Sequence, residues 1–178
     1  MRIFVSHIIS MGMQRMAVLA AVVLCSLTIA AQSHGNHLMV GVGASYPNGV
    51  EGTISYEHET EYHNAWEYFG SYYVKWDKDP TVGHITNDSF WNNYNTWDVG
   101  VAYKPCVNRG RNHHGNFRIG VGVGSDLNRF IGLATVGYEH TYSLYNRWSL
   151  FWQVKEDFVL HGQDKFRTGG TIGIKIPF

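Results

Sequence analysis

Apolar and polar residues alternate with a period of two along most of the chain after residue 34, and this alternation restricts the fold more than any other feature. In the segment 66–77, Trp66 and Tyr68 share one parity, whereas Glu67 and Lys75 share the other. Successive side chains of a β-strand point to opposite faces, so the pattern predicts strands and not helices. It recurs in eight segments, which are 38–45, 51–57, 66–77, 97–104, 117–124, 130–142, 148–155 and 166–178. The sequence therefore predicts an all-β fold of eight antiparallel strands.

The residues before the first strand have the pattern of a secretory signal. Arg2 and Arg15 precede an apolar run from 16 to 31 that ends in small residues. The run is too short for a membrane-spanning helix, which needs about 20 apolar residues. We expect a signal peptide over 1–33 and a barrel domain over 34–178. A lipoprotein signal at Cys25 is the alternative, but Leu24 stands before it where lipid transfer requires a small residue.

Charge and cysteine content exclude several classes of protein. Fourteen basic and fourteen acidic residues balance, and without the two arginines of the leader twelve face fourteen, a net charge of −2. This balance argues against direct binding of nucleic acid. Two cysteines are too few for a disulfide-rich scaffold or a cysteine-rich zinc module.

Eight alternating strands fit two kinds of up-and-down barrel, and the residue types decide between them. A soluble barrel of the lipocalin or avidin kind is apolar inside, whereas a transmembrane barrel is apolar outside. Aromatic residues make up 15% of the chain, too many large rings for the narrow interior of an eight-stranded barrel. They fit the outside as girdles at the two lipid–water interfaces, and we assign this position to Trp66, Tyr68, Tyr72, Trp76, Trp97, Tyr103, Trp148 and Trp152.

The opposite parity carries glycine, serine, threonine and a small set of charged residues. Charged residues make up only 16% of the chain, below the roughly 25% of soluble proteins. Small residues leave room in a narrow interior, and opposite charges can pair across it. We assign to this interior, the lumen, the side chains of Glu57, Glu67, Lys75, Asp98, Arg118, Glu139, Lys155, Arg167 and Lys175.

The last strand ends in an apolar alternation that closes on a carboxy-terminal aromatic residue. Ile172, Ile174, Ile176 and Phe178 resemble the sorting signal that the barrel-insertion machinery of Gram-negative bacteria reads. We therefore expect an outer-membrane location, with lipid and the insertion machinery as partners. An even number of strands places both termini on the periplasmic side. The connections 59–64, 105–115 and 143–146 then face the periplasm, and the loops 45–49, 78–95, 125–129 and 161–164 face outward.

No group of residues predicts catalysis, a cofactor or a metal site. His113 and His114 are adjacent, so on a strand they would point to opposite faces and could not chelate one ion. Glu139 and His140 with Ser143 superficially match the deacylases that modify lipid A, but neighbouring residues again alternate between faces. Eight strands leave a lumen filled by side chains and predict no open pore.

The second half of the chain resembles the conjugative-transposon protein family TraO. The resemblance rests on the hairpin formed by 97–103 and 117–124, and on the later segments 130–132, 138–139, 145–150 and 166–175. The early strands match only in pattern, and the ending 176–178 departs from that family. The resemblance implies an outer-membrane component of a conjugative DNA-transfer apparatus, with other transfer proteins as partners, and carries over no catalytic residue. A general OmpX-like barrel for adhesion, defence or envelope integrity is the alternative, and a lipid A-modifying enzyme is a further one.

Overall fold

A computed structural model describes residues 35–46, 48–76, 83–86, 90, 93–126, 128–162 and 164–178. The chain divides into two units, Met1–His34 and Gly35–Phe178, and the description below concerns the second. The predicted signal peptide and most of the predicted loop 78–95 lie outside the described residues.

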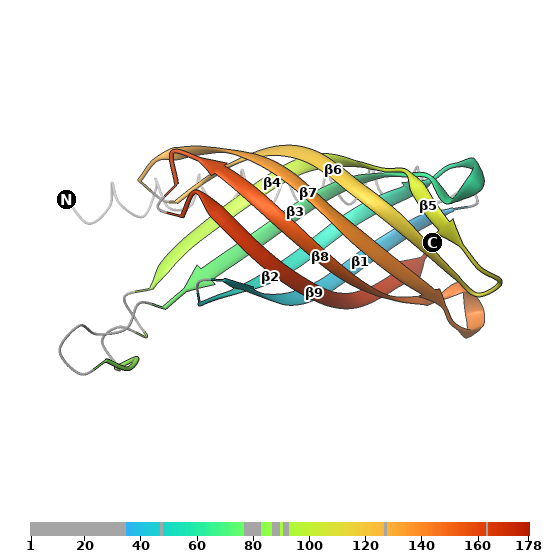
Figure 1. The fold of residues 1–178 in the computed structure, drawn as a ribbon, viewed down its shortest axis with the longest axis horizontal. Helices are drawn as coiled ribbons and strands as arrows, with labels where there is room; N and C mark the ends of the chain where they lie inside the picture. The colour runs from blue at the N-terminus through green and yellow to red at the C-terminus, as the bar shows by residue number, and fades with distance from the viewer. Residues whose placement is uncertain are drawn as a thin grey trace, which may run out of the picture. The chain divides into compact units, whose positions relative to one another are not determined.

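The described residues form a closed antiparallel sheet, drawn in Figure 1. Its strands are β1 (Asn36–Tyr46), β2 (Gly49–Glu59), β3 (Ala65–Lys75), β4 (Tyr94–Lys104), β5 (Cys106–Arg109), β6 (His113–Ser125), β7 (Phe130–Ser143), β8 (Ser149–Leu160) and β9 (Phe166–Pro177). Each long strand pairs with the next long strand along the chain, and β1 pairs with β9 to close the barrel. Both β4 and β5 pair with β6, so they act as one long strand interrupted at Pro105. The prediction of an eight-stranded antiparallel barrel is confirmed.

The segment 105–115 differs from the prediction of a simple connection. It contains β5 and the start of β6, which form a hairpin around a turn at 110–112. The amide of Phe117 donates to the carbonyl of Pro105 at 2.9 Å, so the β4–β6 ladder continues across the proline, which has no N–H of its own. The proline, asparagines and glycines of this segment are turn formers, which is why composition alone predicted a loop.

The two ends of the barrel are built differently. At one end, the hairpin end, lie the turns after β2, β5 and β7, together with the C-terminus (Figure 1). The turns after β2 and β7 are the short helices η2 (Glu61–His63) and η3 (Tyr145–Arg147), each with two consecutive residues at positive φ. The other end, the loop end, carries the connections after β1, β3, β6 and β8. In the described part of the chain, no helix is long and apolar enough to cross a membrane.

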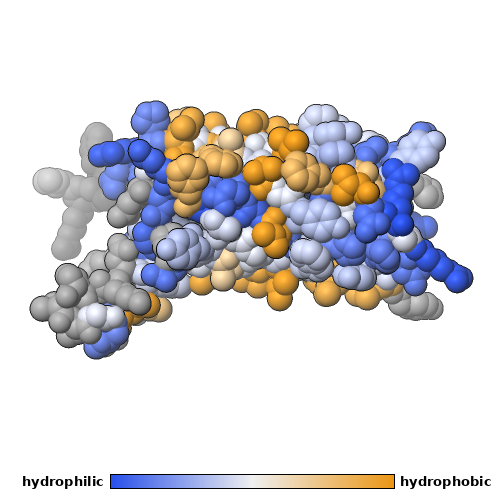
Figure 2. All heavy atoms as spheres, in the orientation of Figure 1, coloured by the Kyte–Doolittle hydropathy of each residue, from blue (hydrophilic) through white to orange (hydrophobic). Residues whose placement is uncertain are grey.

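The outer face of the barrel is apolar. Valine, isoleucine and aromatic side chains that alternate along every long strand are exposed to the outside. Figure 2 shows these hydrophobic residues along the side of the barrel, with hydrophilic residues gathered at both ends. The barrel is thus the reverse of a water-soluble domain, which buries its large apolar side chains.

Two phenylalanines fill the middle of the interior, and glycines on neighbouring strands make room for them. The ring of Phe69 lies over Gly100, where an added Cβ would be 2.5 Å from its Cζ atom. The ring of Phe151 lies over Gly173, where an added Cβ would be 2.6 Å from Cε1. The glycine-rich inner face therefore serves the packing of large rings inside a narrow barrel.

Candidate functional site

The predicted girdle residues lie on the outer face in two groups. Trp66, Tyr68, Tyr103, Trp148 and Trp152 lie toward the hairpin end, and Tyr72, Trp76 and Trp97 lie toward the loop end. Neighbouring rings contact one another: the centroids of Trp66 and Tyr103 are 5.0 Å apart, and those of Trp76 and Phe90 are 5.8 Å apart. Between the two groups the outward positions are aliphatic, as at Val121 in the middle of β6.

A cluster of buried ion pairs, the hairpin-end cluster, fills the interior near the hairpin end. Its centre is the ammonium group of Lys104, which forms an ion pair with Glu57 and lies 2.8 Å from Oε2 of Glu139. Lys175 also bridges these two carboxylates, with both N···O distances at 2.7 Å. Four strands, β2, β4, β7 and β9, are thereby connected across the barrel.

Arg118 and Glu67 extend the hairpin-end cluster toward the middle of the barrel. The guanidinium of Arg118 donates from Nε to Oε2 of Glu67 at 2.8 Å and from Nη1 to the hydroxyl of Thr135 at 2.9 Å. Its planar face lies over Phe69, 4.6 Å from the ring centroid. The cluster therefore holds three cations and three carboxylates, and this balance offsets the large cost of removing the charges from water.

A second group of charges, the loop-end cluster, occupies the interior near the loop end. Lys155 lies 2.5 Å from Oε1 of Glu51 and 2.8 Å from Oδ2 of Asp157. Asp98 accepts a hydrogen bond of 2.6 Å from the Ser71 hydroxyl.

Arg167 also belongs to the loop-end cluster, and it forms no ion pair with a carboxylate among the described residues. Its guanidinium donates to the hydroxyl of Thr96 at 3.0 Å and lies over the ring of Tyr73 at 4.2 Å. Outside this cluster, at the rim, Lys75 donates to Asp164 at 2.9 Å.

The space between the two clusters is nearly closed. A cavity of about 10 Å³ remains, lined by Met39, Phe69 and Phe151 together with charged residues of both clusters. This volume holds about one water molecule. The interior is a packed plug of ion pairs and rings and not a channel.

The structure places all nine predicted lumenal charges on the inner face, eight of them buried and Lys75 half-buried at the rim. The prediction omitted three charged residues that also lie inside: Glu51, Lys104 and Asp157. Lys104 is the centre of the network, and its parity on β4 is that of Asp98. That shared parity was the available signal.

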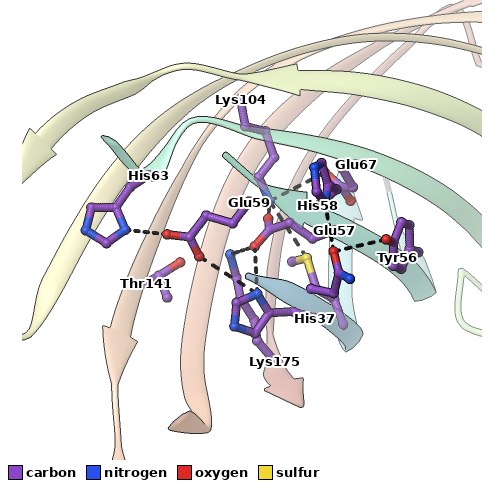
Figure 3. Close-up of polar contacts among 12 residues, drawn as sticks. His37, Tyr56, Glu57, His58, Glu59, His63, Glu67, Lys104, Thr141 and Lys175 are labelled. Carbon is purple, nitrogen blue, oxygen red and sulfur yellow. Dashed lines mark hydrogen bonds and ion pairs between the residues drawn. The ribbon is translucent and has the colours of Figure 1, made fainter. Parts of the chain in front are cut away.

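Histidines and carboxylates gather at the mouth of the hairpin end, shown in Figure 3. The Nδ1 atom of His37 lies 3.8 Å from Oε2 of Glu59 and 3.9 Å from Oε1 of Glu57. Nδ1 of His63 contacts the other oxygen of Glu59, and the His63 ring stacks on His114 with centroids 4.5 Å apart. One ligand atom each from His37, Glu57 and Glu59 lies within 4.8 Å of the others, a spacing that suits a metal ion. Sequence reasoning missed this group because its members come from distant segments.

The residues considered for catalysis do not come together. Glu139 is buried in the hairpin-end cluster, whereas His140 lies on the outer face, with its ring stacked on Trp152 at 5.7 Å. His113 and His114 also diverge, since His113 stacks on His140 and His114 stacks on His63.

The predicted sorting signal forms the outward parity of β9 and the chain end. Ile172, Ile174 and Phe178 are exposed, and Ile176 is half-buried. The ring of Phe178 contacts that of Tyr56, with centroids 5.8 Å apart.

A scan against models of known families and a search of curated proteins both found no match. Among solved structures, a designed transmembrane β-barrel is similar at a TM-score of 0.50 and 14% identity, over 82% of this chain and 99% of the design. The outer-membrane protein Ail of Yersinia pestis, solved in a phospholipid bilayer nanodisc, has a TM-score of 0.43 and 10% identity, over 79% of this chain and 99% of Ail. The match to the design shows that this chain has the fold of a transmembrane β-barrel.

Proposed function

We propose that this protein is a small, sealed barrel of the Gram-negative outer membrane, of the general OmpX-like kind, which acts without catalysis. The observation that carries the proposal is the inverted distribution of residues. Among the described residues, thirty-two large hydrophobic side chains are exposed and only nine hydrophobic residues are buried. In water such a surface would aggregate, whereas in lipid it is the stable outer face.

The proposed orientation follows from the chain ends. The first strand begins and the last strand ends at the hairpin end. If both ends of the barrel domain lie on the periplasmic side, the hairpin end faces the periplasm. The loop end then faces outward, and it carries the long connection between β3 and β4. Surface contacts in adhesion or defence would be made from this end.

Cell fractionation tests the membrane location. We expect the protein in the outer-membrane fraction and expect its gel mobility to change only after heating, because closed barrels resist detergent when cold. Recovery in the soluble periplasmic fraction would contradict the proposal.

A depth series of arginine substitutions tests which solvent covers the outer face. Ile172 lies midway along β9 and is 65% exposed, whereas Phe166 begins the strand at the loop end. In lipid, Ile172→Arg should lower the free energy of unfolding by about 2–4 kcal/mol and Phe166→Arg by about 0–1 kcal/mol. Equal, small effects of the two substitutions would indicate that water and not lipid covers this face.

The packed interior supports a role without transport. We expect purified protein in planar bilayers to give no stable open-channel conductance, since the cavity between the two clusters holds about one water molecule. A steady conductance like that of a porin would contradict this part of the proposal.

The barrel-insertion machinery is the partner that we propose for assembly. The exposed terminal residue Phe178 supports this proposal, because its aromatic ring ends the outward alternation of β9. Deletion of Phe178 should lower the amount of assembled barrel in the outer membrane, whereas deletion of an amino-terminal residue of the mature chain should not. Normal assembly of the truncated chain would remove this partner.

A role in conjugative DNA transfer is the second candidate, and its support is the resemblance of residues 97–175 to TraO. Loss of transfer frequency on deletion of the gene, without a general envelope defect, would favour it. Lipid A modification is the least supported candidate because Glu139 and His140 occupy opposite faces of β7. An unchanged lipid A mass on expression is the expected result.

A further inference from the structure

The mouth of the hairpin end contains a histidine nitrogen that is buried without a hydrogen bond. Nδ1 of His37 has no hydrogen-bond partner among the described residues, although the ring sits inside the barrel with only 13% of its side chain exposed. Buried nitrogen atoms are rarely left in this state. Carboxylate oxygens of Glu57 and Glu59 lie 3.9 and 3.8 Å from this nitrogen, too far for a hydrogen bond.

The carboxylate of Glu59 carries a negative charge that the hairpin-end cluster does not balance. Within that cluster three cations already match three carboxylates, and Glu59 is additional. Glu59 contacts two imidazoles, those of His37 and His63. Each imidazole balances the carboxylate charge only when it is protonated. The mouth therefore combines an excess negative charge with two imidazoles.

The positions of the three ligand atoms match what a small transition metal ion requires. In a tetrahedral zinc site with bonds of about 2.0–2.2 Å, ligand atoms are about 3.3 Å apart. The present separations of 3.8 and 3.9 Å from His37 to the two carboxylates need only a small inward movement. Oε1 of Glu57 also lies 2.7 Å from Nζ of Lys175, so a metal ion would share this oxygen with the ammonium group. Glu59 is also held from its far side by Nδ1 of His63, which is the usual way that an outer group orients a metal ligand.

We propose that His37, Glu57 and Glu59 bind a divalent transition metal ion, with Zn²⁺ as the representative, and that His63 orients Glu59. The site opens to the aqueous side of the hairpin end. The exposed side-chain fraction falls from 47% at His63 to 20% at Glu59 and 13% at His37, so an ion can enter from water past His63. The bound ion would connect β1, which begins the barrel, to β2. Because it would bind the folded state and not the unfolded state, it would stabilise the folded state. This inference does not depend on the membrane location proposed above.

The nitrogen ligand predicts selectivity. Imidazole suits Zn²⁺, Cu²⁺ and Ni²⁺, whereas Mg²⁺ and Ca²⁺ prefer sites made only of oxygen. We therefore expect Zn²⁺ to bind and Mg²⁺ at the same concentration not to compete.

The test is calorimetric titration of ZnCl₂ into the full chain, folded in detergent micelles at neutral pH without an affinity tag. We expect one saturable site that Glu59→Gln weakens about tenfold or more and that His37→Gln abolishes. The matched control is His161→Gln, a histidine at the loop end, which should leave this site unchanged. Each variant is first checked for folding by its heat-dependent gel mobility. If His37→Gln fails to fold, Glu59→Gln still tests the site, because glutamine keeps the shape of the glutamate side chain.

A second measurement separates this site from weak binding elsewhere on the chain. Zn²⁺ should raise the midpoint of thermal unfolding of the wild type and of His161→Gln, and should raise it less in Glu59→Gln. Binding of Zn²⁺ to Glu59→Gln and His37→Gln with the affinity and stoichiometry of the wild type would overturn the proposal, as would competition by Mg²⁺.

Discussion

The two charged clusters inside the barrel differ in how completely their members are paired. In the hairpin-end cluster, Lys104 and Lys175 each bridge Glu57 and Glu139, and the cations and carboxylates are equal in number. In the loop-end cluster, two nitrogen atoms of Arg167 have no hydrogen-bond partner among the described residues. Oδ1 of Asp157 also has none. The first is a closed network, and the second contains buried polar atoms that form no hydrogen bond within the described chain.

The two clusters therefore constrain the strands to different degrees. The hairpin-end cluster crosses the lumen between strands that are not neighbours in the sheet, so it constrains how the strands face one another. The loop-end cluster also lies inside the barrel, but some of its buried polar atoms form no hydrogen bond within the described chain. We expect the hairpin end to be the more rigid half and the more sensitive to loss of a single charge.

The largest effect should follow removal of the central cation. Lys104→Met leaves three carboxylates without their shared partner in a dry environment, and we expect a loss of about 3–5 kcal/mol in the free energy of unfolding. Denaturant titration of the barrel in lipid vesicles measures it. Lys155→Met at the loop end is the matched comparison and should cost less, because Lys155 pairs with two carboxylates, Glu51 and Asp157, whereas Lys104 contacts three.

A double variant refines this prediction. Adding Glu139→Gln to Lys104→Met removes one of the stranded charges and should restore part of the lost stability. If Lys155→Met proves more damaging than Lys104→Met, the contrast between the two ends is wrong.

An intermediate effect is expected in the aromatic layer that separates the clusters. At Gly100 an added Cβ would lie 2.4 Å from the carbonyl oxygen of Val121 and 2.5 Å from the ring of Phe69. Gly100→Ala should therefore cost about 1–3 kcal/mol. Gly52→Ala is the control, because nothing lies within 4 Å of a Cβ at Gly52, and it should change stability by less than about 0.5 kcal/mol. Equal effects of the two would mean that both the Phe69 ring and the backbone at Val121 can move aside.

The smallest effect is expected at the rim of the loop end. Lys75 and Asp164 form an ion pair in which each side chain is 12% exposed. Asp164→Asn should lower the free energy of unfolding by about 0.2–1 kcal/mol, and added salt should reduce the difference from the wild type. A loss as large as that of Lys104→Met would show that the loop end is as tightly constrained as the hairpin end.

The alternation of residue types predicted the architecture because facing direction in a strand is a local property. Parity along β3 is enough to place Trp66 on one face and Glu67 on the other, whatever the remainder of the chain does. The same reasoning failed for β5, where turn-forming residues are held in a ladder by pairing with β6. Tertiary pairing there outweighs the local preference.

The partners across the lumen could not be predicted in this way. Whether Lys104 meets Glu139 or Asp98 depends on the tilt and stagger of the strands, which one sequence does not reveal. The group at the mouth was hidden for the same reason, since His37, Glu59 and His63 come together only through the β1–β2 register and the turn η2.

The pairing of β1 with β9 has a consequence for how the molecule is made. A ladder of ten residue pairs, from His37 with Pro177 to Tyr46 with Thr168, joins the first and last strands of the described barrel. No partial chain can form this seam, so until the last strand is synthesised the first strand keeps a bare edge open to any other strand. Contacts between residues so distant in sequence also form slowly. Until the seam closes, the unpaired edge of β1 is a place where a wrong strand can pair.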